Sequence, residues 1–186
     1  NNTRFLCSQS TGNCGFDKIN QILQNIYNPD GKPVSGGAGV VPSAKNNYDS
    51  RALQKFRVGD LVMRTSNDYL KNEPVIYLNG DVGWLQPVQL GGDDVAKFIK
   101  EKDVNSMFSV MYQNNSIDTG KTENVDIKEL NDEFALSYAI SVHKAQGSQY
   151  DNVIIMMTPD QYYMWADDKC EGFNLLYTAV SRAKSR

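Results

Sequence analysis

The stretch LSYAISVHKAQGSQYD, residues 136–151, decides the fold. Its first part, Leu136 to Val142, is rich in β-branched and aromatic residues and predicts a buried strand. Polar residues follow at once, and then Gly147, which lets a backbone approach a ligand closely. Because α/β proteins place ligands where a strand runs into such a turn, we expect a binding site here. Donors that suit phosphate oxygens are carried by Ser141, His143 and Lys144.

A second stretch, LLYTAVSRAK at residues 175–184, predicts a helix from Asn174 to Lys184. Its apolar residues recur at helical spacing and would form a buried stripe, namely Leu176, Ala179, Val180 and Ala183. Arg182 lies off this stripe and is therefore expected to point outward. An outward arginine can bind a γ-phosphate through its planar fork and neutralise charge in a transition state. Between the two stretches, VIIMM at residues 153–157 predicts another buried strand.

Together the two stretches resemble motifs V and VI of the superfamily 1 helicases, in the branch that includes RecD and TraA. In that family the first motif reads roughly A-[ITV]-[ST]-V-H-K-[SA]-Q-G-S-E, and the second reads L-Y-T-A-[VI]-[ST]-R-A. Each stretch alone has a simpler explanation, because polar turns and outward arginines are common on protein surfaces. The helicase interpretation depends on the occurrence of both stretches in this order in one chain. The sequence departs from the pattern at Gln149, where the family usually has Glu.

The resemblance implies an α/β fold: the second RecA-like domain of a helicase (2A), of the P-loop NTPase type, split by an inserted small SH3-like β-barrel (2B). We expect domain 2A to comprise residues 1–54 and 133–186, and domain 2B to comprise residues 55–132. The sequence contains no G-x-x-x-x-G-K-[ST] loop to cradle phosphates. In the family that Walker A loop lies in the first RecA-like domain, so we interpret the chain as the C-terminal portion of a longer enzyme.

The N-terminal block predicts a short strand at residues 4–7, a polar loop at 8–15 and an amphipathic helix from Phe16 to Tyr27. The helix is expected to stop at Asn-Pro-Asp-Gly, residues 28–31. The block resembles motif IV of RecD-like helicases, in which G-x-x-x-x-N leads into a helix. Gly15 and Asn20 occupy the matching positions. The loop is neutral here, whereas the family often has basic residues in it.

The block FRVGDLVMRTSNDYLKNEPVIYLNGDVG, residues 56–83, predicts a strand at 56–63 with a Gly59-Asp60 kink, and a second strand at 75–78. The pair Asn79-Gly80 predicts a hairpin turn, because both residues tolerate positive φ. The block resembles the segment that opens domain 2B in RecD-like helicases. That resemblance implies DNA-backbone contacts at Asn67, Asn79 and Gly80, and turn formation alone is the alternative explanation for Asn79 and Gly80.

The remaining patterns are weaker. Residues 31–50 predict a long loop, 90–105 a short amphipathic helix, and 107–112 and 122–127 two strands, with the barrel closing near Leu130. Three aromatic residues precede the second motif and could stack on bases, but more often such residues cover the edge of a core: Tyr162, Tyr163 and Trp165.

Composition sets further limits. At 40% hydrophobic and 22% charged residues, the chain of 186 residues has the composition of an ordinary globular protein. Its net charge of −3 argues against tight nucleic-acid binding by this piece alone. Three cysteines without a C-x-x-C pair, beside one His, form no zinc pattern. No apolar run is long enough to span a bilayer and no signal peptide is present, so we expect no membrane contact. The odd, sparse cysteine count suits a reducing cytosol, so we expect a cytoplasmic protein.

The resemblance implies an ATP-dependent DNA helicase that moves 5′ to 3′ on single-stranded DNA and acts in DNA repair or recombination. It uses ATP and Mg²⁺, with the Mg²⁺ ligands outside this chain. Its partners are single-stranded DNA, the preceding RecA-like domain and subunits of a helicase–nuclease complex. The implied catalytic residue is Arg182, the ATP-binding residues are Gln146, Gly147, Gln149 and Arg182, and the DNA-binding residues are Ser141, His143, Lys144, Asn67, Asn79 and Gly80.

Alone, this portion is expected to be inactive. Two alternatives remain open. The chain could be a non-catalytic nucleic-acid-binding or docking module from a degenerate helicase, or the helicase part of a conjugative relaxase.

Overall fold

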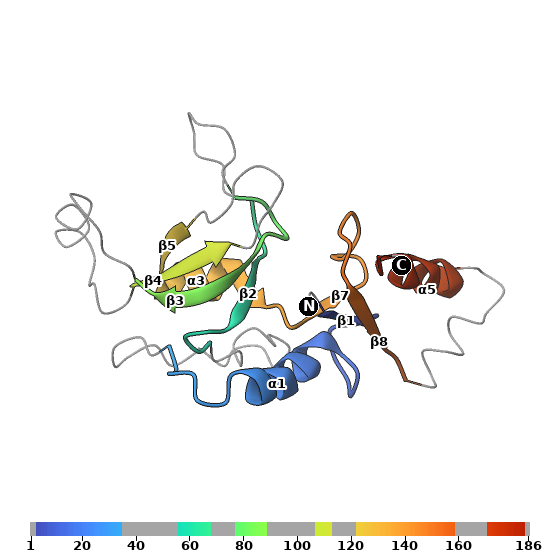
Figure 1. Ribbon diagram of the computed structural model, residues 1–186, viewed down its shortest axis with the longest axis horizontal. Helices are drawn as coiled ribbons and strands as arrows, with labels where there is room; N and C mark the ends of the chain where they lie inside the picture. Colours follow the sequence, from blue (N-terminus) through green and yellow to red (C-terminus); the bar gives the residue numbers. More distant parts are fainter. Residues whose placement is uncertain are drawn as a thin grey trace. The chain divides into compact units, whose positions relative to one another are not determined.

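The computed structural model describes residues 3–34, 56–67, 77–88, 107–112, 122–158 and 171–184. The chain forms two compact units, one from residues 1–27 and 138–186 and the other from residues 28–137. The second unit is thus inserted between two segments of the first (Figure 1). The predicted domain boundaries, after residues 54 and 132, stay a prediction.

The first unit is built on a parallel sheet of three strands in the order β7-β1-β8. The central strand β1 (Thr3–Cys7) confirms the predicted strand at residues 4–7, and its Leu6 and Cys7 are fully buried. Phe5 pairs on one side with Ala139 of β7 (Ala139–Ser141) and on the other with Ile154 of β8 (Asn152–Met156). Because the strands are parallel, their carboxyl ends meet at one edge, where α/β proteins place ligands.

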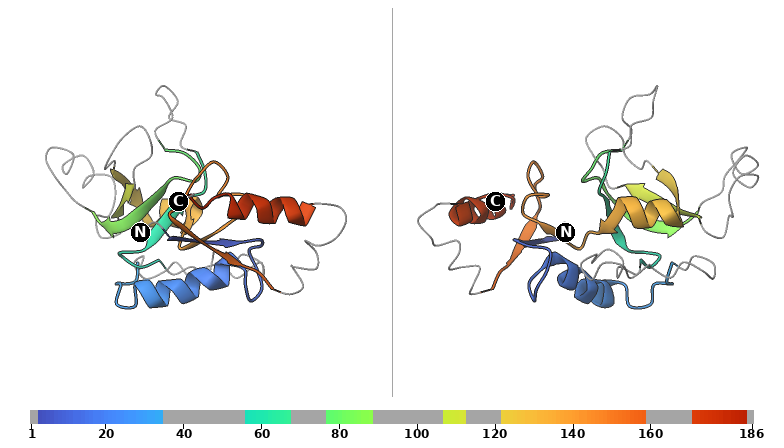
Figure 2. Two further views of the ribbon diagram at one scale, coloured as in Figure 1. Left: turned by 45° about the vertical axis from the view of Figure 1, so that its right-hand side comes forward. Right: turned by 180° about the vertical axis from the view of Figure 1, so that it is seen from behind.

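Helix α1 (Phe16–Tyr27) has the predicted bounds and buries Ile19 and Leu23. Asn20 lies on the same buried face with 0% of its surface exposed. Its side-chain amide donates to the carbonyl oxygen of Ala139 and accepts from the Ala139 backbone N–H, both at 2.8 Å. Helix α1 is therefore attached to the first residue of β7. Helix α5 (Glu171–Val180) contacts β8, and the two helices lie on opposite sides of the strands (Figure 2).

The structure corrects the prediction of one buried strand over residues 136–142. Leu136 ends strand β6 (Phe134–Leu136) of the second unit, whereas β7 starts at Ala139 in the first. The Ser137 N–H donates to the Leu61 carbonyl, so the break follows from pairing with a distant strand. The predicted burial of residues 153–157 is also wrong, because the residues of β8 are half-buried or exposed.

The second unit contains an antiparallel sheet of five strands in the order β5-β4-β3-β2-β6. Its other strands are β2 (Leu61–Arg64), β3 (Val82–Pro87), β4 (Met107–Tyr112) and β5 (Thr122–Asp126). Helix α3 (Ile127–Glu133) packs against β5 and β6. Within the described part of the chain, the edge strands β5 and β6 do not pair with each other, so the sheet is open and the predicted closed SH3-like barrel is not confirmed. The fold class is mixed α/β, with one parallel and one antiparallel sheet.

Several local predictions for the second unit are confirmed. The kink before β2 is present, with Gly59 at φ +93°, although the strand starts at Leu61 and not at Phe56. A turn is present at Asn79-Gly80, with Gly80 at φ +100°, but the predicted hairpin is not, because β3 pairs with β2 and β4. Strands β4 and β5 match the predicted strands at 107–112 and 122–127, except that Ile127 starts α3. Other predictions lie wholly or partly outside the described residues: the loop at 31–50, the strand at 75–78, the helix at 90–105 and the aromatic residues Tyr162, Tyr163 and Trp165.

Replacement of Asn20 tests the attachment of α1 to β7. Asn20→Ala leaves the buried N–H and carbonyl of Ala139 without these partners, and we expect a loss of about 2–4 kcal/mol in unfolding free energy. Gln21→Ala, at an exposed position of the same helix, is the control and should change little. Thermal unfolding followed by circular dichroism measures both, and equal midpoints for the two variants would contradict the role of Asn20.

Candidate functional site

The residues after β7 form a compact turn, residues 142–148. The turn is anchored to the sheet because the Val142 N–H donates to the Cys7 carbonyl at 3.0 Å. Internal hydrogen bonds close it, including Ala145 N–H to the Ser141 carbonyl at 3.1 Å and Ser148 N–H to the Ala145 carbonyl at 3.1 Å. The turn is thus held by its own backbone at the carboxyl end of a parallel strand.

Burial separates the side chains of this turn into two sets. Val142 and Ala145 are fully buried and fix the turn to the core. The predicted ligand-binding residues in the turn and just after it are exposed: His143, Lys144, Gln146, Gly147 and Gln149. Ser141 is half-buried, and its hydroxyl oxygen accepts from the Lys144 N–H at 3.2 Å. A hydroxyl that accepts a bond in this way retains its own O–H as a donor.

Arg182 does not lie on a helix, which corrects the prediction of a helix to Lys184. Helix α5 ends at Val180, and the N–H groups of Arg182 and Ala183 donate to the carbonyls of Ala179 and Val180 in a tighter turn. The helix stops because the following residues pair with Tyr150: the Arg182 carbonyl accepts from its N–H, and the Lys184 N–H donates to its carbonyl. The predicted buried stripe is also partly wrong, since Ala179 is buried but Val180 and Ala183 are exposed.

The side chain of Arg182 reaches the 142–148 turn. Its Nε donates to the Thr178 carbonyl at 3.1 Å, one terminal nitrogen donates to the Ser148 carbonyl at 3.4 Å, and the other to the Ser181 hydroxyl at 2.9 Å. Lys184 Nζ lies 3.0 Å from an Asp151 carboxylate oxygen and adds a second link between the two segments. The structure therefore brings the two sequence stretches together at one place in the first unit.

The other predicted residues, Asn67, Asn79 and Gly80, form a corner in the second unit, which we define as residues 66–67 and 78–81. The Asn67 side-chain oxygen accepts from the Asn79 N–H at 2.7 Å. The Asp81 N–H donates to the Leu78 carbonyl at 3.0 Å, and its carboxylate accepts from the Leu78 N–H at 2.9 Å. All three predicted residues are exposed. The corner is a well-bonded turn that presents amide groups to solvent.

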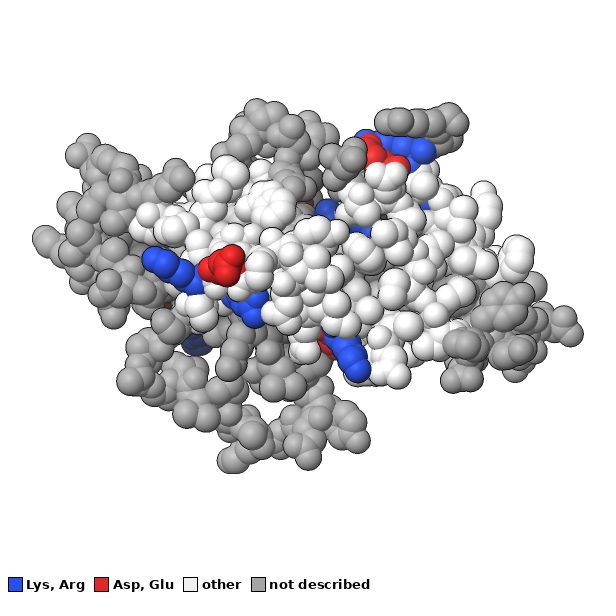
Figure 3. All heavy atoms as spheres, turned by 60° about the horizontal axis from the view of Figure 1, so that its bottom comes forward, with Lys and Arg blue, Asp and Glu red and all other residues white. Residues whose placement is uncertain are grey.

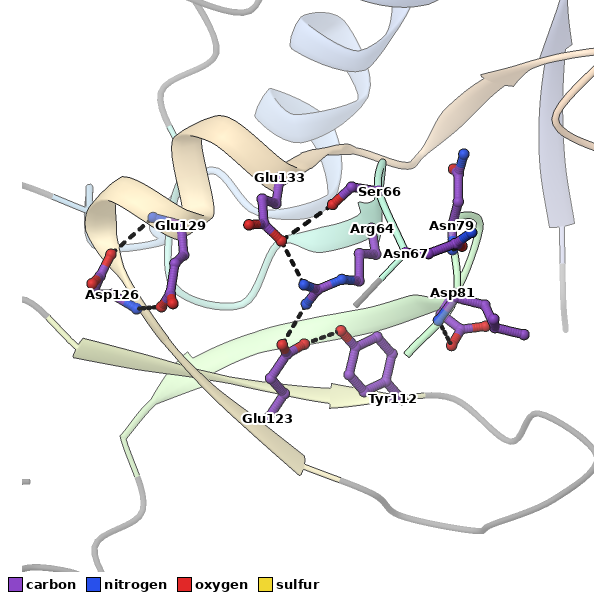
Figure 4. A network of polar contacts seen from close by, with 11 residues as sticks. Arg64, Ser66, Asn67, Asn79, Asp81, Tyr112, Glu123, Asp126, Glu129 and Glu133 are labelled. Atoms are coloured by element: carbon purple, nitrogen blue, oxygen red, sulfur yellow. Dashed lines mark hydrogen bonds and ion pairs between the residues drawn. The ribbon is translucent and has the colours of Figure 1, made fainter. Parts of the chain in front are cut away.

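A partly buried ionic network, which no local sequence signal indicates, lies beside this corner (Figure 4). Arg64 is 4% exposed, and its guanidinium donates to the carboxylates of Glu123 and Glu133. The Tyr112 hydroxyl also donates to Glu123. Burial alone would lower the pKa of Arg64, but the hydrogen bond and charge of Glu123 reverse that effect and raise it. Burial, followed by the charge of Glu123, raises the pKa of Tyr112, so its phenol keeps the proton that it donates.

Metal-binding groups give no further site among the described residues. On the face drawn in Figure 3, lysines and arginines lie apart from one another, and several neighbour acidic side chains. No group of three or more His, Cys, Asp or Glu side chains in the described ranges could bind a metal ion. No helix within them is long and apolar enough to cross a membrane. Burial raises the pKa of the Cys7 thiol to about 12, so this buried cysteine is not a nucleophile at neutral pH.

The segment that contains the 142–148 turn and Arg182 is similar to a known protein family. Residues 136–186 match the UvrD-like helicase C-terminal domain. The match begins at Leu136 and includes both stretches that the structure brings together. The predicted resemblance to superfamily 1 helicases is therefore confirmed.

Two curated relatives extend the similarity over most of the chain. The ATP-dependent RecD2 DNA helicase of Deinococcus radiodurans is 27% identical over 94% of this chain. The RecBCD enzyme subunit RecD of Mycolicibacterium smegmatis is 26% identical over 98% of it. The chain spans only 18% and 24% of the length of these two relatives.

Among solved structures, the chain is similar to Bacteroides Pif1 bound to single-stranded DNA. The TM-score is 0.51 and the sequence identity 20%, over 98% of this chain and 38% of that one. This similarity shows a shared fold, the mixed α/β RecA-like helicase domain.

A glycine replacement tests the backbone of the 142–148 turn. Gly147 has φ +83° and no atom within 4 Å of an added Cβ, so Gly147→Ala should cost only backbone strain, about 1 kcal/mol. Gly147→Asn should cost less, because Asn tolerates this conformation. Gly15→Ala is the contrast, since its Cβ would lie 2.3 Å from the Thr11 carbonyl oxygen. Urea unfolding should rank Gly15→Ala as clearly the more destabilising, and an equal or larger loss for Gly147→Ala would contradict this description.

Proposed function

We propose that the chain supplies the second RecA-like domain of an ATP-dependent DNA helicase of the RecD-like group, which moves 5′ to 3′ on single-stranded DNA. The observation that carries the proposal is the contact of Arg182 with the Ser148 carbonyl, because it joins the stretches that resemble motifs V and VI into one site. The name of one curated relative, the ATP-dependent RecD2 DNA helicase, supports DNA as the substrate and ATP as the energy source.

Arg182 acts on ATP that binds between this domain and a first RecA-like domain. Arginine carries five N–H donors. Three of those on Arg182 bind protein oxygens, which orients the guanidinium and leaves donors for a phosphate oxygen. As the γ-phosphoryl group transfers to water, the guanidinium stabilises the charge on its oxygens.

Three exposed groups of the turn and its end contact the nucleotide side of the same cleft in this proposal: Gln146, Gly147 and Gln149. Gly147 contributes backbone without a side chain, and the two glutamines contribute neutral amides. Mg²⁺ would supply positive charge against the phosphates, and residues of the first RecA-like domain, outside this chain, would hold it. The chain alone is therefore inactive as an ATPase.

Single-stranded DNA is bound through its phosphates. His143 and Lys144 are exposed on the 142–148 turn, and the Ser141 hydroxyl at its start retains a donor. Such contacts bind the DNA backbone with little preference for sequence. In the inserted unit, which we propose to be an SH3-like domain 2B over residues 55–132, the exposed corner residues Asn67, Asn79 and Gly80 contact the DNA backbone as well.

Arg182→Ala in the full-length protein should lower DNA-stimulated ATP hydrolysis on the order of a thousandfold, because charge on the γ-phosphoryl group loses its partner. Nucleotide affinity, measured with a fluorescent ATP analogue, should change little. Arg182→Lys keeps the positive charge but not the planar fork, and should recover only a small part of the rate. Lys18→Ala, which removes an exposed lysine of α1, is the control and should hydrolyse ATP normally.

Near-normal hydrolysis by Arg182→Ala would remove this residue from the mechanism. Absence of hydrolysis in the unmodified full-length protein would instead favour a non-catalytic nucleic-acid-binding or docking module.

Lys144→Ala in the full-length protein should weaken single-stranded DNA binding and flatten its salt dependence by about 0.7 in the slope of log K against log salt, since one phosphate contact is lost. Fluorescence anisotropy over a range of NaCl concentrations measures the slope. Lys18→Ala removes an exposed lysine from α1 of the same unit and is the matched control. An unchanged slope for Lys144→Ala would show that Lys144 does not contact the DNA.

A further inference from the structure

Arg64 is bonded to the corner through its backbone and to the interior of the second unit through its side chain. Its N–H donates to the Asp81 carbonyl at 2.9 Å, and its carbonyl accepts from the Gly80 N–H at 2.9 Å. Its guanidinium binds Glu123 of β5 and Glu133 at the end of α3. One residue therefore connects the turn at Gly80 with two elements far away in the sequence (Figure 4).

Glu133 carries this connection to the other half of the corner. Its carbonyl accepts from the Thr65 N–H at 2.7 Å, and its carboxylate accepts from the Ser66 hydroxyl at 3.2 Å. Ser66 directly precedes Asn67, whose side chain binds the Asn79 N–H. The placement of Asn67 therefore depends on Glu133, and that of the Glu133 carboxylate depends on Arg64.

Aromatic rings provide a second path from Arg64 to the corner. The guanidinium carbon lies 5.3 Å from the ring centre of Phe134 and 5.7 Å from that of Tyr77. Tyr77 stacks on Tyr112 with ring centres 5.0 Å apart, and it directly precedes Leu78, where the corner resumes. A planar guanidinium can bind two carboxylates and stack on rings at once, whereas a lysine ammonium cannot.

A network of this kind fixes geometry more than it adds stability. Removing the Arg64 guanidinium and the Glu123 carboxylate from water costs about as much as their attraction returns, while the Glu133 carboxylate stays partly exposed. Replacement of a buried ionic cluster by apolar residues is therefore often neutral for stability. The directional bonds of Arg64 nevertheless define where both strands of the corner lie.

We infer that Arg64 is a positioning residue, which sets the geometry of the corner amides at residues 66–67 and 78–81. The importance of that geometry for DNA binding rests on the proposed function of the corner. Arg64 itself is buried and acts on a ligand only through Asn67, Asn79 and Gly80.

The test compares Arg64→Lys with Arg57→Lys in the full-length protein. Arg57 lies in the same unit and donates to the Asn28 carbonyl, so its replacement is a matched loss of one guanidinium. Hydrogen exchange at residues 78–81 reports corner geometry directly. Two further quantities show whether the corner geometry matters for DNA binding or for turnover. They are the single-stranded DNA concentration that gives half-maximal ATP hydrolysis, and kcat at saturating DNA.

Arg64→Lys should speed exchange of the Asn79 and Gly80 amides about tenfold and raise the half-saturating DNA concentration about tenfold, with kcat unchanged. Arg57→Lys should change none of these quantities. In an Asn67→Ala background, Arg64→Lys should add little to the DNA effect, because both changes disturb the same contact. Ser66→Ala, which removes only the hydroxyl bond to Glu133, should give a smaller change in the same direction. This variant replaces Arg64→Lys in the test if Arg64→Lys does not fold.

Unchanged exchange at residues 78–81 in folded Arg64→Lys, or in Ser66→Ala if that is the variant available, would overturn the positioning role. Faster exchange with unchanged DNA dependence would support the positioning role and overturn the proposed DNA contact of the corner. Additive effects of Arg64→Lys and Asn67→Ala on the DNA concentration would also overturn the inference, because they would show that Arg64 acts elsewhere.

Discussion

Two hydrogen bonds between the Asn20 amide and the backbone of Ala139 hold the first unit together. The residues are 119 positions apart, one before and one after the inserted unit. β7 is an edge strand, and an amide side chain offers it the same donor and acceptor that a neighbouring strand would. Aspartate lacks the donor and leucine lacks both groups. Asparagine is therefore the short side chain that satisfies both atoms of Ala139, and it fixes the place where the chain returns to the parallel sheet.

The candidate site depends on that fixed starting point. β7 is only three residues long, and the 142–148 turn begins directly after it. Further along the chain, the Tyr150 backbone bonds to residues 182 and 184, and the Arg4 guanidinium lies 5.2 Å from the centre of the Tyr150 ring. A displaced β7 would move the turn relative to Arg182. The exposed polar groups of the site are thus positioned by buried contacts, as ligand-binding groups on rigid scaffolds generally are.

The predictable parts of this fold are those with local signals. Apolar spacing located β1 and α1, and glycine conformations located the kink at Gly59 and the turn at Gly80. The capping box Asp126…Glu129 also marks α3, which the sequence analysis overlooked. The division of residues 136–142 between two sheets and the end of α5 at Val180 depend on pairing with distant segments. Nothing near Arg64 in the sequence shows that its partners are Glu123 and Glu133.

Both units use buried polar side chains where apolar contacts would leave the arrangement ambiguous. An apolar contact is non-directional and tolerates a small slip, whereas a hydrogen bond fails when its partner moves by about 1 Å. In a chain whose first unit is interrupted by an insertion, segments must find each other at a defined register. Asn20 defines it for β7 through a neutral amide, at no cost in buried charge. Arg64 defines the geometry of the corner through a charge that needs two carboxylates. The corner is therefore more sensitive than β7 to the loss of one partner.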